Sequence, residues 1–279
     1  MRIVASRADL RRAISGMPRP VALVPTMGAL HAGHGTLLDL ARRHAPTVVA
    51  SVFVNPMQFS DADDLATYPR TPEEDDALCE AHLVDLVWRP GRADVFASED
   101  PEPVPPSLAD ELEGRDRPGH FVGVATVVRE LWSAASPDLA VFGEKDYQQL
   151  VVLRALAARR GGPAIVAGAT HRDPDGLASS SRNARLSPEA RRVALALPRA
   201  LGHALERWRR GERGAGEICA RVATEMRGAA TSAVPVEVHY AAVRDAESLA
   251  EVRDARSGTR LLVAATVAGV RLIDNVPLA

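Results

Sequence analysis

Two histidines, His31 and His34, stand in a turn whose residue types suit the binding of phosphate. They belong to the run Pro-Thr-Met-Gly-Ala-Leu-His-Ala-Gly-His at residues 25–34, which follows the apolar residues 21–24. The pattern predicts a strand, a glycine-containing turn and a helix, an arrangement that brings backbone N–H groups and the positive end of the helix to one point. An imidazole donates N–H groups as a neutral or a cationic ring near pH 7. We therefore expect a site that stabilises the changing charge of a phosphate.

This turn differs from two common phosphate-binding motifs. It has neither the Gly-Lys-Ser/Thr of the Walker motif nor the Gly-x-Gly-x-x-Gly of dinucleotide-binding proteins. It is similar to the His-x-Gly-His signature of the nucleotidyltransferase superfamily, whose members act at the α-phosphate of ATP. A helix start with two surface histidines is the alternative. Gly28 and Gly33 favour a ligand site, because a residue without Cβ lets a ligand approach the backbone.

Two amide side chains follow the next predicted strand, residues 48–54. Asn55 and Gln58 flank Pro56, and proline ends strand pairing, so both amides are expected on a loop. An amide donates and accepts hydrogen bonds, which suits a substrate that carries hydroxyl groups. A turn with an internally satisfied asparagine is the alternative.

A lysine opens the helix that follows the predicted strand 139–142. Lys145 and Asp146 lie in the run Gly-Glu-Lys-Asp-Tyr-Gln-Gln at residues 143–149. Helix capping accounts for Asp146, which also suits a ribose hydroxyl. Capping does not account for Lys145, because a cation at a helix N-terminus opposes the helix dipole, so a phosphate contact is favoured. Gln149 follows one turn later, on the face that returns to the expected crevice.

A serine-rich segment, residues 175–183, reads Asp-Gly-Leu-Ala-Ser-Ser-Ser-Arg-Asn. Its three hydroxyls and the guanidinium of Arg182 are the donors expected around pyrophosphate. Gly176 is a candidate hinge for a loop that closes over ATP. A flexible serine linker is the alternative.

The elements that must position these residues show two patterns. Short apolar strands alternate with helices through residue 170, which is typical of a parallel sheet that binds ligands at the carboxyl ends of its strands. Thr71 and Glu74 predict a capping box at the second helix, and the acidic, proline-rich residues 99–106 predict a surface loop. The predicted strands are 21–25, 48–54, 84–88, 139–142 and 164–167, and the predicted helices are 35–44, 72–82, 121–135 and 147–160.

Longer helices and a short meander follow after residue 170. Helices are predicted at 188–210 and 215–227, and strands at 236–243, 261–267 and 270–273 with a tight turn at 268–269. The fold class that we expect is α/β, with a Rossmann-like parallel sheet in an N-terminal domain over residues 1–170. A smaller α+β domain is expected over residues 171–279.

Composition excludes several classes of protein. The net charge of −2 over 279 residues gives no basic footprint for nucleic acid. The apolar runs are too short for a membrane span, and residues 1–10 lack the apolar core of a secretory signal. Cys79 and Cys219 are far apart in the sequence, which predicts reduced thiols and a cytoplasmic location.

Together the motifs resemble the pantothenate synthetase family, ligases that join pantoate to β-alanine with ATP. The resemblance covers nearly the whole chain and implies ATP and Mg²⁺ as cofactors, pantoate and β-alanine as substrates, and a homodimer without nucleic-acid or membrane partners. It identifies no direct metal ligand. The runs that carry it are residues 25–34, 54–59, 68–71, 142–150, 175–183 and 260–277.

The resemblance also implies roles for single residues. The residues implied as catalytic are His34, His31, Lys145, Ser180, Ser181 and Arg182. Gln58 is implied to contact pantoate and β-alanine, Gln149 to contact pantoate, and Asn55 lies beside them. The residues implied to contact ATP are Met27, Gly28, Ala29, Leu30, His31, Ala32, Gly33, His34, Gly143, Glu144, Lys145, Asp146, His171, Ser179, Ser180, Ser181 and Arg182.

Three positions depart from the family pattern without removing a chemical group from the predicted site. Ser179 stands where methionine is usual, and His-Arg-Asp-Pro at residues 171–174 replaces an apolar–Arg–Glu–Ala run. Gly35 stands where a bulky apolar residue is common, which weakens the start of a helix by about 0.5–1 kcal/mol relative to alanine.

The implied reaction has two steps. The carboxylate of pantoate attacks the α-phosphate of Mg-ATP to give pantoyl adenylate and pyrophosphate, and the amine of β-alanine then releases pantothenate and AMP. A His-x-Gly-His enzyme with a phosphate-ester acceptor would call for Lys or Arg around residues 55–58, where this chain has amides. A class I aminoacyl-tRNA synthetase would need a basic anticodon-binding domain. A non-catalytic ATP sensor is the remaining alternative, although His34, Lys145 and Arg182 are all present.

Overall fold

The computed structural model describes residues 1–59, 65–98 and 100–279. The chain divides into two compact units, Met1–Glu144 with Val152–Ala169, and Lys145–Val151 with Thr170–Ala279. The division falls within a single helix, α9 (Tyr147–Arg160). The domain boundary at residue 170 stays a prediction.

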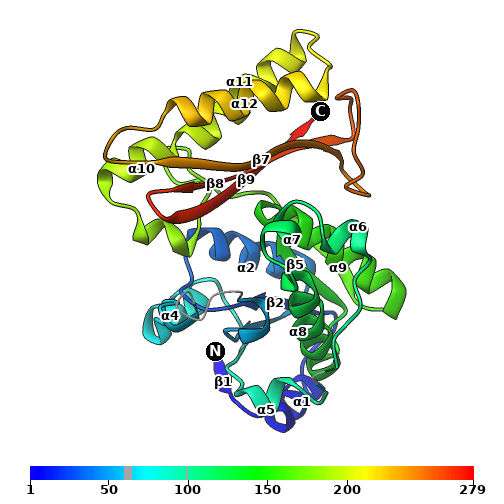
Figure 1. Ribbon diagram of the computed structural model, residues 1–279. Helices are drawn as coiled ribbons and strands as arrows, with labels where there is room; N and C mark the ends of the chain where they lie inside the picture. The colour runs from blue at the N-terminus through cyan, green and yellow to red at the C-terminus, as the bar shows by residue number, and fades with distance from the viewer. Residues whose placement is uncertain (60–64, 99) are drawn as a thin grey trace. The chain divides into compact units, whose positions relative to one another are not determined.

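The first unit contains a sheet of six parallel strands in the order β1-β4-β3-β2-β5-β6 (Figure 1). The strands are β1 (Arg2–Val4), β2 (Val21–Thr26), β3 (Thr47–Val52), β4 (Leu86–Trp88), β5 (Leu139–Gly143) and β6 (Ala164–Gly168). The Rossmann-like parallel sheet is confirmed, and its five predicted strands lie within two residues of their predicted bounds. The short β1 was not predicted.

Helices cover the sheet and bury its central strands. Ala22 and Val24 of β2 pack with Leu38 and Ala41 of α2 in one apolar cluster, while Leu23, which points to the opposite face, is also fully buried. Within the described residues of this unit, the helices besides part of α9 are α1 (Arg7–Ser15), α2 (Ala32–His44), α4 (Pro72–Ala81), α5 (Arg92–Val95), α6 (Pro106–Ala109), α7 (Glu113–Asp116) and α8 (His120–Ala135). A short 3₁₀ helix, η1 (Pro56–Gln58), follows β3, and another, η2 (Glu144–Asp146), follows β5.

The structure accounts for the departure at Gly35. This glycine lies inside α2, and a Cβ there would stand 2.5 Å from Nε2 of His82. Nδ1 of the His82 ring is 2.7 Å from Oδ1 of Asp39, so the ring is held in place. A bulky side chain at position 35 would have to displace His82.

The second unit contains an antiparallel sheet of three strands, β7 (Val236–Asp245), β8 (Thr259–Val267) and β9 (Val270–Leu278). The predicted turn between the last two is confirmed: Ala268 and Gly269 have φ values of 47° and 79°, as a two-residue hairpin turn requires. Helices α11 (Ala196–Arg209) and α12 (Ala215–Gly228) lie across one face of this sheet (Figure 1). The single helix predicted at 188–210 is in fact two: α10 (Pro188–Ala194) ends at Ala194, and α11 begins at Ala196 after the shared cap residue Leu195.

Both cysteines are free thiols. Burial raises the pKa of the Cys79 thiol to about 11. Among the residues that the structure describes, no helix has the length and hydropathy that crossing a membrane requires.

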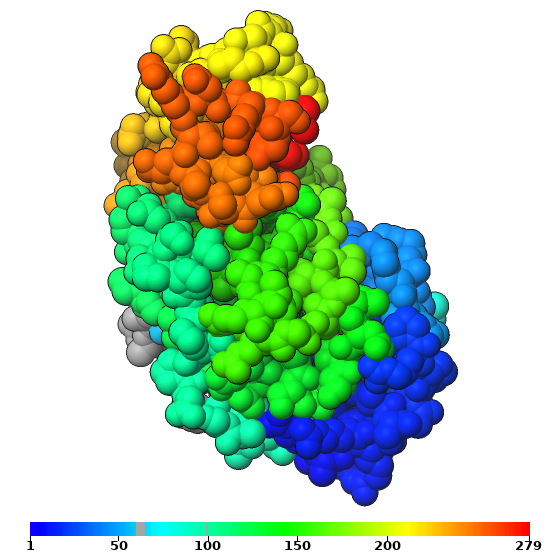
Figure 2. Space-filling view, turned by 90° about the vertical axis from the view of Figure 1, so that its right-hand side faces the viewer, coloured from blue at the N-terminus to red at the C-terminus, as the bar shows by residue number. Residues whose placement is uncertain are grey.

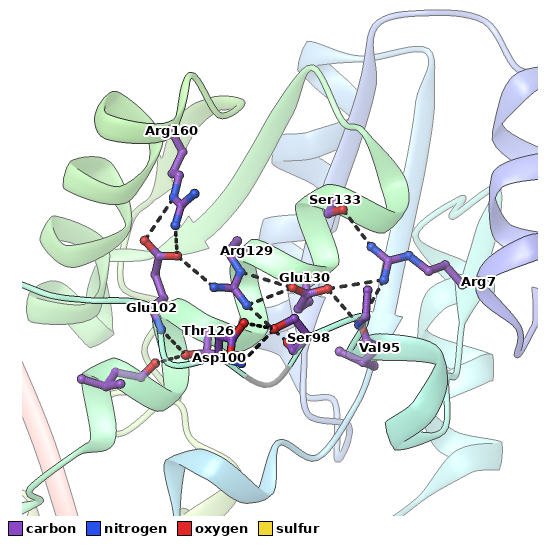
Figure 3. Close-up of polar contacts among 12 residues, drawn as sticks. Arg7, Val95, Ser98, Asp100, Glu102, Thr126, Arg129, Glu130, Ser133 and Arg160 are labelled. Carbon is purple, nitrogen blue, oxygen red and sulfur yellow. Dashed lines mark hydrogen bonds and ion pairs between the residues drawn. The ribbon is translucent and has the colours of Figure 1, made fainter.

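The acidic segment that we expected on the surface instead contributes a buried carboxylate. Glu99 lies outside the described residues, and Pro101 and Pro103 are exposed, but Glu102 is fully buried. The turquoise segment around residues 100–110 adjoins the green surface of α9 in Figure 2. Glu102 accepts from Arg129 of α8 at 3.1 Å, from Arg160 of α9 at 2.7 Å (Figure 3) and from Arg159. The surface prediction was wrong for Glu102 because its partners come from two distant helices.

This cluster predicts an acid-sensitive contribution to stability. Burial alone would raise the pKa of the Glu102 carboxyl, but hydrogen bonds from Arg160 and Arg129 lower it below its usual value. The carboxylate therefore stabilises the fold fully above the unfolded-state pKa of about 4.3, and this contribution is lost as the pH falls through the folded-state value.

We expect Glu102→Gln to lower the free energy of unfolding at pH 7 by about 1–3 kcal/mol. The effect is not larger because solvent screens the charges of Arg159 and Arg160, which are exposed. Urea unfolding measures this, and the difference from the wild type should shrink below about pH 4. Glu80→Gln, at an exposed position of α4, is the control and should have little effect. Equal stabilities of Glu102→Gln and the wild type at pH 7 would contradict the prediction.

Candidate active site

The turn after β2 lies where the order of the parallel sheet reverses. The chain runs from β2 to β3 and β4 on one side, and β5 then pairs with β2 on the other side. Ligands of open parallel sheets bind outside the carboxyl ends of the strands at such a reversal. Residues 27–34 follow β2, and Gly143 and Glu144 end β5 and begin η2. The first unit therefore places the histidine turn, together with Gly143 and Glu144, at the switch point of its sheet.

The two histidines cap α2 by reciprocal hydrogen bonds. Nδ1 of His31 accepts from the N–H of Gly33 at 3.1 Å, and Nδ1 of His34 accepts from the N–H of His31 at 3.2 Å. A ring nitrogen that accepts a hydrogen bond has no proton, so each neutral ring carries its proton on Nε2. The ring centroids are 4.1 Å apart. The pair is thus arranged with two Nε2–H groups, which suit neighbouring phosphate oxygens.

The backbone N–H groups of this turn have protein partners, contrary to our expectation that they converge on a ligand. Asp75 of α4 accepts from the N–H of Ala29 at 3.2 Å through Oδ2 and from the N–H of Leu30 at 2.7 Å through Oδ1. The N–H of Gly28 lies 3.3 Å from Oγ1 of Thr26. The N–H groups of residues 28–30 are therefore used within the protein.

Asp75 was not predicted as part of the site. The capping box expected from Thr71 and Glu74 is absent: Thr71 makes no side-chain cap, and its hydroxyl donates to Oδ1 of Asp75 at 3.1 Å. The local pattern was correct about the start of the helix but assigned the wrong carboxylate. The two partners of Asp75 in the histidine turn lie 45 and 46 residues away along the chain, too far for a local sequence pattern to indicate them.

The turn is also conformationally strained. Gly28 and Ala29 have φ values of 82° and 50°. Glycine tolerates this left-handed region, whereas a residue with a side chain adopts it at a cost of about 1–2 kcal/mol. Contacts from the rest of the unit must hold Ala29 in this conformation.

The predicted amides Asn55 and Gln58 lie together, but Asn55 is internally satisfied. Its Oδ1 accepts from the N–H of Met57 at 3.1 Å, and its Nδ2 donates to Oε1 of Gln58 and to the carbonyl of Gly123, both at 3.1 Å. This is the alternative that the sequence left open, and a substrate contact by Asn55 stays a prediction. Nε2 of Gln58 is 2.8 Å from the sulfur of Met27, so Gln58 adjoins the histidine turn.

Two further residues hold the backbone of Gln58. Its carbonyl accepts from Nη2 of Arg117 and from Nδ1 of His120, each at 2.9 Å. The close approach needs Gly123, where a Cβ would stand 2.3 Å from the carbonyl oxygen of Met57. No spacing signal in the sequence joins residues 117–123 to this loop.

In the second unit, the backbone of Lys145 is anchored by the closing strand. Its carbonyl accepts from Nδ2 of Asn275 at 3.0 Å, and Oδ1 of Asn275 accepts from Arg260 at 2.5 Å. The Arg260 guanidinium lies 3.7 Å from the centroid of the Tyr147 ring. The ammonium of Lys145 is 3.7 Å from Oδ1 of Asp146, and the Asp146 residue is exposed. Gln149, the other site residue predicted near this lysine, is half-buried.

The sequence holds a signal for Lys145 that we did not use. Lys145 is the only lysine among 279 residues, since the other cationic side chains are arginines. An ammonium is a compact point charge, whereas a guanidinium is a planar fork. The composition alone therefore singles out Lys145 as a candidate site residue.

The serine–arginine loop is tied to a carboxylate network, also in the second unit. Ser179 donates to Oδ1 of Asp173 at 2.5 Å, and Nδ1 of His171 lies 2.7 Å from the same hydroxyl. The Ser179 proton is thus used, so His171 must donate from Nδ1. Oδ2 of Asp173 accepts from Arg191 at 2.7 Å and from Asn183 at 3.3 Å. Burial alone would raise the pKa of the Asp173 carboxyl, but these hydrogen bonds, Ser179's first, lower it.

Two departures from the family pattern are therefore in direct contact. Ser179, in place of methionine, bonds to Asp173 and His171, which lie in the other altered run. The hydroxyl of Ser180 accepts from the N–H of Arg182 at 3.3 Å and begins η3 (Ser181–Arg185). The loop has defined hydrogen bonds at both ends, which a flexible serine linker would lack.

Comparison with known proteins gives matches to one family over nearly the whole chain. Residues 2–277 match the family model of pantoate-beta-alanine ligase. The pantothenate synthetase of Thiobacillus denitrificans is 45% identical over 280 residues, which cover 99% of this chain and 96% of the relative. That of Saccharopolyspora erythraea is 46% identical over 271 residues, or 96% of this chain and 87% of the relative.

Solved structures agree with this match. The crystal structure of pantothenate synthetase from Thermus thermophilus has a TM-score of 0.92 and 41% identity, covering 100% of this chain and 99% of that one. A pantoate-beta-alanine ligase from Francisella tularensis, complexed with beta-gamma ATP and beta-alanine, has a TM-score of 0.78 and 27% identity, covering 100% and 98%. The chain belongs to the pantoate–β-alanine ligase family.

Proposed function

We propose that this chain condenses (R)-pantoate with β-alanine, using ATP, in the biosynthesis of pantothenate and hence of coenzyme A. The observation that carries the proposal is the reciprocal cap of His31 and His34 at the switch point of the sheet. Membership of the family indicates which substrates are used. The imidazole groups of the cap are of a type that suits phosphate chemistry.

The reaction proceeds in two displacements. A carboxylate oxygen of pantoate bonds to the α-phosphorus of ATP as the bond to pyrophosphate breaks, which leaves pantoyl adenylate. The amine of β-alanine then bonds to the acyl carbon, and AMP leaves. Neither step needs a protein nucleophile, so positioning and charge stabilisation are the contributions required of the protein.

Different residues are proposed to contribute positioning and charge stabilisation. The Nε2–H groups of His31 and His34 donate to phosphate oxygens as negative charge develops, and Lys145 supplies a fixed positive charge. Ser180, Ser181 and Arg182 are proposed as further nucleotide contacts. Gln58 and Gln149 are proposed to orient pantoate through neutral hydrogen bonds.

Mg²⁺ is proposed as a partner of ATP rather than of a protein cage. Among the described residues, no group of three or more His, Cys, Asp or Glu side chains is placed to hold a metal ion. Mg²⁺ commonly keeps several waters and binds substrate phosphates, where it neutralises charge, so such a group is not required. A homodimer and a cytoplasmic location are proposed from the family resemblance alone.

Isotope exchange between pyrophosphate and ATP tests the two-step reaction. We expect exchange with pantoate in the absence of β-alanine, because the adenylate forms before the amine is used. Reactions with β-alanine alone, or with neither substrate, are the controls. Exchange that requires β-alanine would contradict the two steps, and no exchange together with tight ATP binding would support the sensor alternative.

Loss of a phosphate donor should lower kcat. His34→Ala and Lys145→Ala each remove one preorganised group, for which the expected loss in kcat is about 10²–10³. The KM for pantoate should change less, since these groups face the nucleotide. His44→Ala, at an exposed position of the same helix as His34, is the matched control and should leave kcat unchanged. A near-normal kcat in His34→Ala would show that the histidine assignment is wrong.

Substitution of Gln58 by Glu tests the substrate pocket. The change keeps the size of the side chain, removes two N–H donors and places a negative charge beside a carboxylate substrate. We expect pantoate activation to fall at least about tenfold, while ATP affinity, measured by calorimetry, stays close to the wild-type value. Equal losses of both would instead assign Gln58 to the nucleotide or the fold.

A further inference from the structure

The contacts of Asp75 point to a positioning residue for the proposed catalytic histidines. Asp75 is 2% exposed, and its carboxylate accepts three hydrogen bonds, from the N–H groups of Ala29 and Leu30 and from the hydroxyl of Thr71. Two of these three donors belong to the turn that ends at His31. We propose that Asp75 fixes the conformation of this turn and thereby the placement of His31 and His34, without touching substrate itself.

The turn needs an external acceptor because of its backbone. The left-handed conformations of Gly28 and Ala29 direct the N–H groups of residues 29 and 30 toward α4, where Asp75 accepts both. A carboxylate offers two oxygens at a fixed spacing, so one side chain serves two consecutive N–H groups. In the absence of that acceptor, two partly buried donors would lose their partner and the strained Ala29 would relax.

The packing leaves little room for adjustment. A Cβ at Gly28 would stand 3.0 Å from Oδ2 of Asp75 and 3.2 Å from a methyl carbon of Val52. The carboxylate is held from its own side by the Thr71 hydroxyl, and the backbone N–H of Asp75 donates to the carbonyl of Thr71 at 2.8 Å. The turn is thus fitted between a fixed carboxylate and β3.

The hydrogen bond from Leu30 to Asp75 lies one residue before the first histidine, so its loss would affect both histidines. Leu30 directly precedes His31, and the N–H of His31 donates to Nδ1 of His34. A displaced Leu30 would therefore disturb the reciprocal cap and, with it, the direction of both Nε2–H groups. This inference rests on the proposed function for its catalytic consequence, but its structural part stands on the contacts alone.

The test compares Asp75→Asn with Asp76→Asn. Asparagine has almost the same shape as aspartate but offers one oxygen, and its NH₂ group would face a backbone N–H. Asp76 is the neighbouring residue on α4 and pairs with Arg89 at 2.8 Å rather than with the turn, so Asp76→Asn is the matched control.

For Asp75→Asn we expect kcat for pantothenate formation to fall at least about tenfold, with the KM values for ATP and pantoate changed less than about threefold. Hydrogen–deuterium exchange of a peptide covering residues 27–31 should accelerate about tenfold, because two amide protons lose their acceptor. The control should show neither effect. A general loss of stability would raise exchange throughout the chain, whereas positioning changes this peptide first.

Thr71→Val provides a second route if Asp75→Asn does not fold. It removes one hydrogen bond to the carboxylate and keeps the turn's two donors paired, so kcat should fall about threefold in the same direction. Normal kcat and normal exchange of residues 27–31 in Asp75→Asn, or in Thr71→Val where only that variant folds, would overturn the inference. Normal kcat in His34→Ala would instead overturn the proposed function, and the exchange measurement would still decide the structural role of Asp75.

Discussion

The first unit depends on one sharp change of direction, from β2 into α2, at the point where the order of the sheet reverses. The chain makes this change through two consecutive left-handed residues, Gly28 and Ala29. The carboxylate of Asp75 holds the turn on one side, and the reciprocal cap of His31 and His34 closes it on the other. The cap determines which ring nitrogens carry protons, so the local fold sets the chemistry of both side chains. Preorganisation of this kind is how a protein stabilises charge in a reaction without a covalent step.

Carboxylates organise backbone segments in both units. Asp75 holds the histidine turn, and Asp173 holds the serine–arginine loop through Ser179 and Arg191. In the second case Ser179 and Asp173 both lie at positions that depart from the expected family pattern, and they form one hydrogen-bonded set with His171. Replacement of Ser179 alone would therefore leave Asp173 and His171 without a shared partner. In this chain, residues 171, 173 and 179 are therefore joined in one hydrogen-bonded set.

Sequence patterns predicted the elements whose signals are local. The apolar run before Gly28 predicted β2, and the alternation of strands and helices predicted the parallel sheet. Contacts between distant segments were not predictable in this way: nothing near Asp75 points to Ala29, and nothing near Glu102 points to the arginines of α8 and α9. The three-residue β1 carried too little pattern to be found. The uniqueness of Lys145 was visible in the sequence, whereas the internal satisfaction of Asn55 required the structure.

The reciprocal cap predicts that both imidazoles are neutral with their protons on Nε2, and the proposed chemistry depends on this arrangement. Nitrogen NMR of histidine-labelled protein at neutral pH, with resonances assigned through His31→Gln and His34→Gln, measures the protonation of each ring nitrogen directly. We expect an unprotonated, hydrogen-bonded Nδ1 and a protonated Nε2 in both residues. A proton on Nδ1 of either ring, as the other neutral form or as the cation, would contradict this expectation.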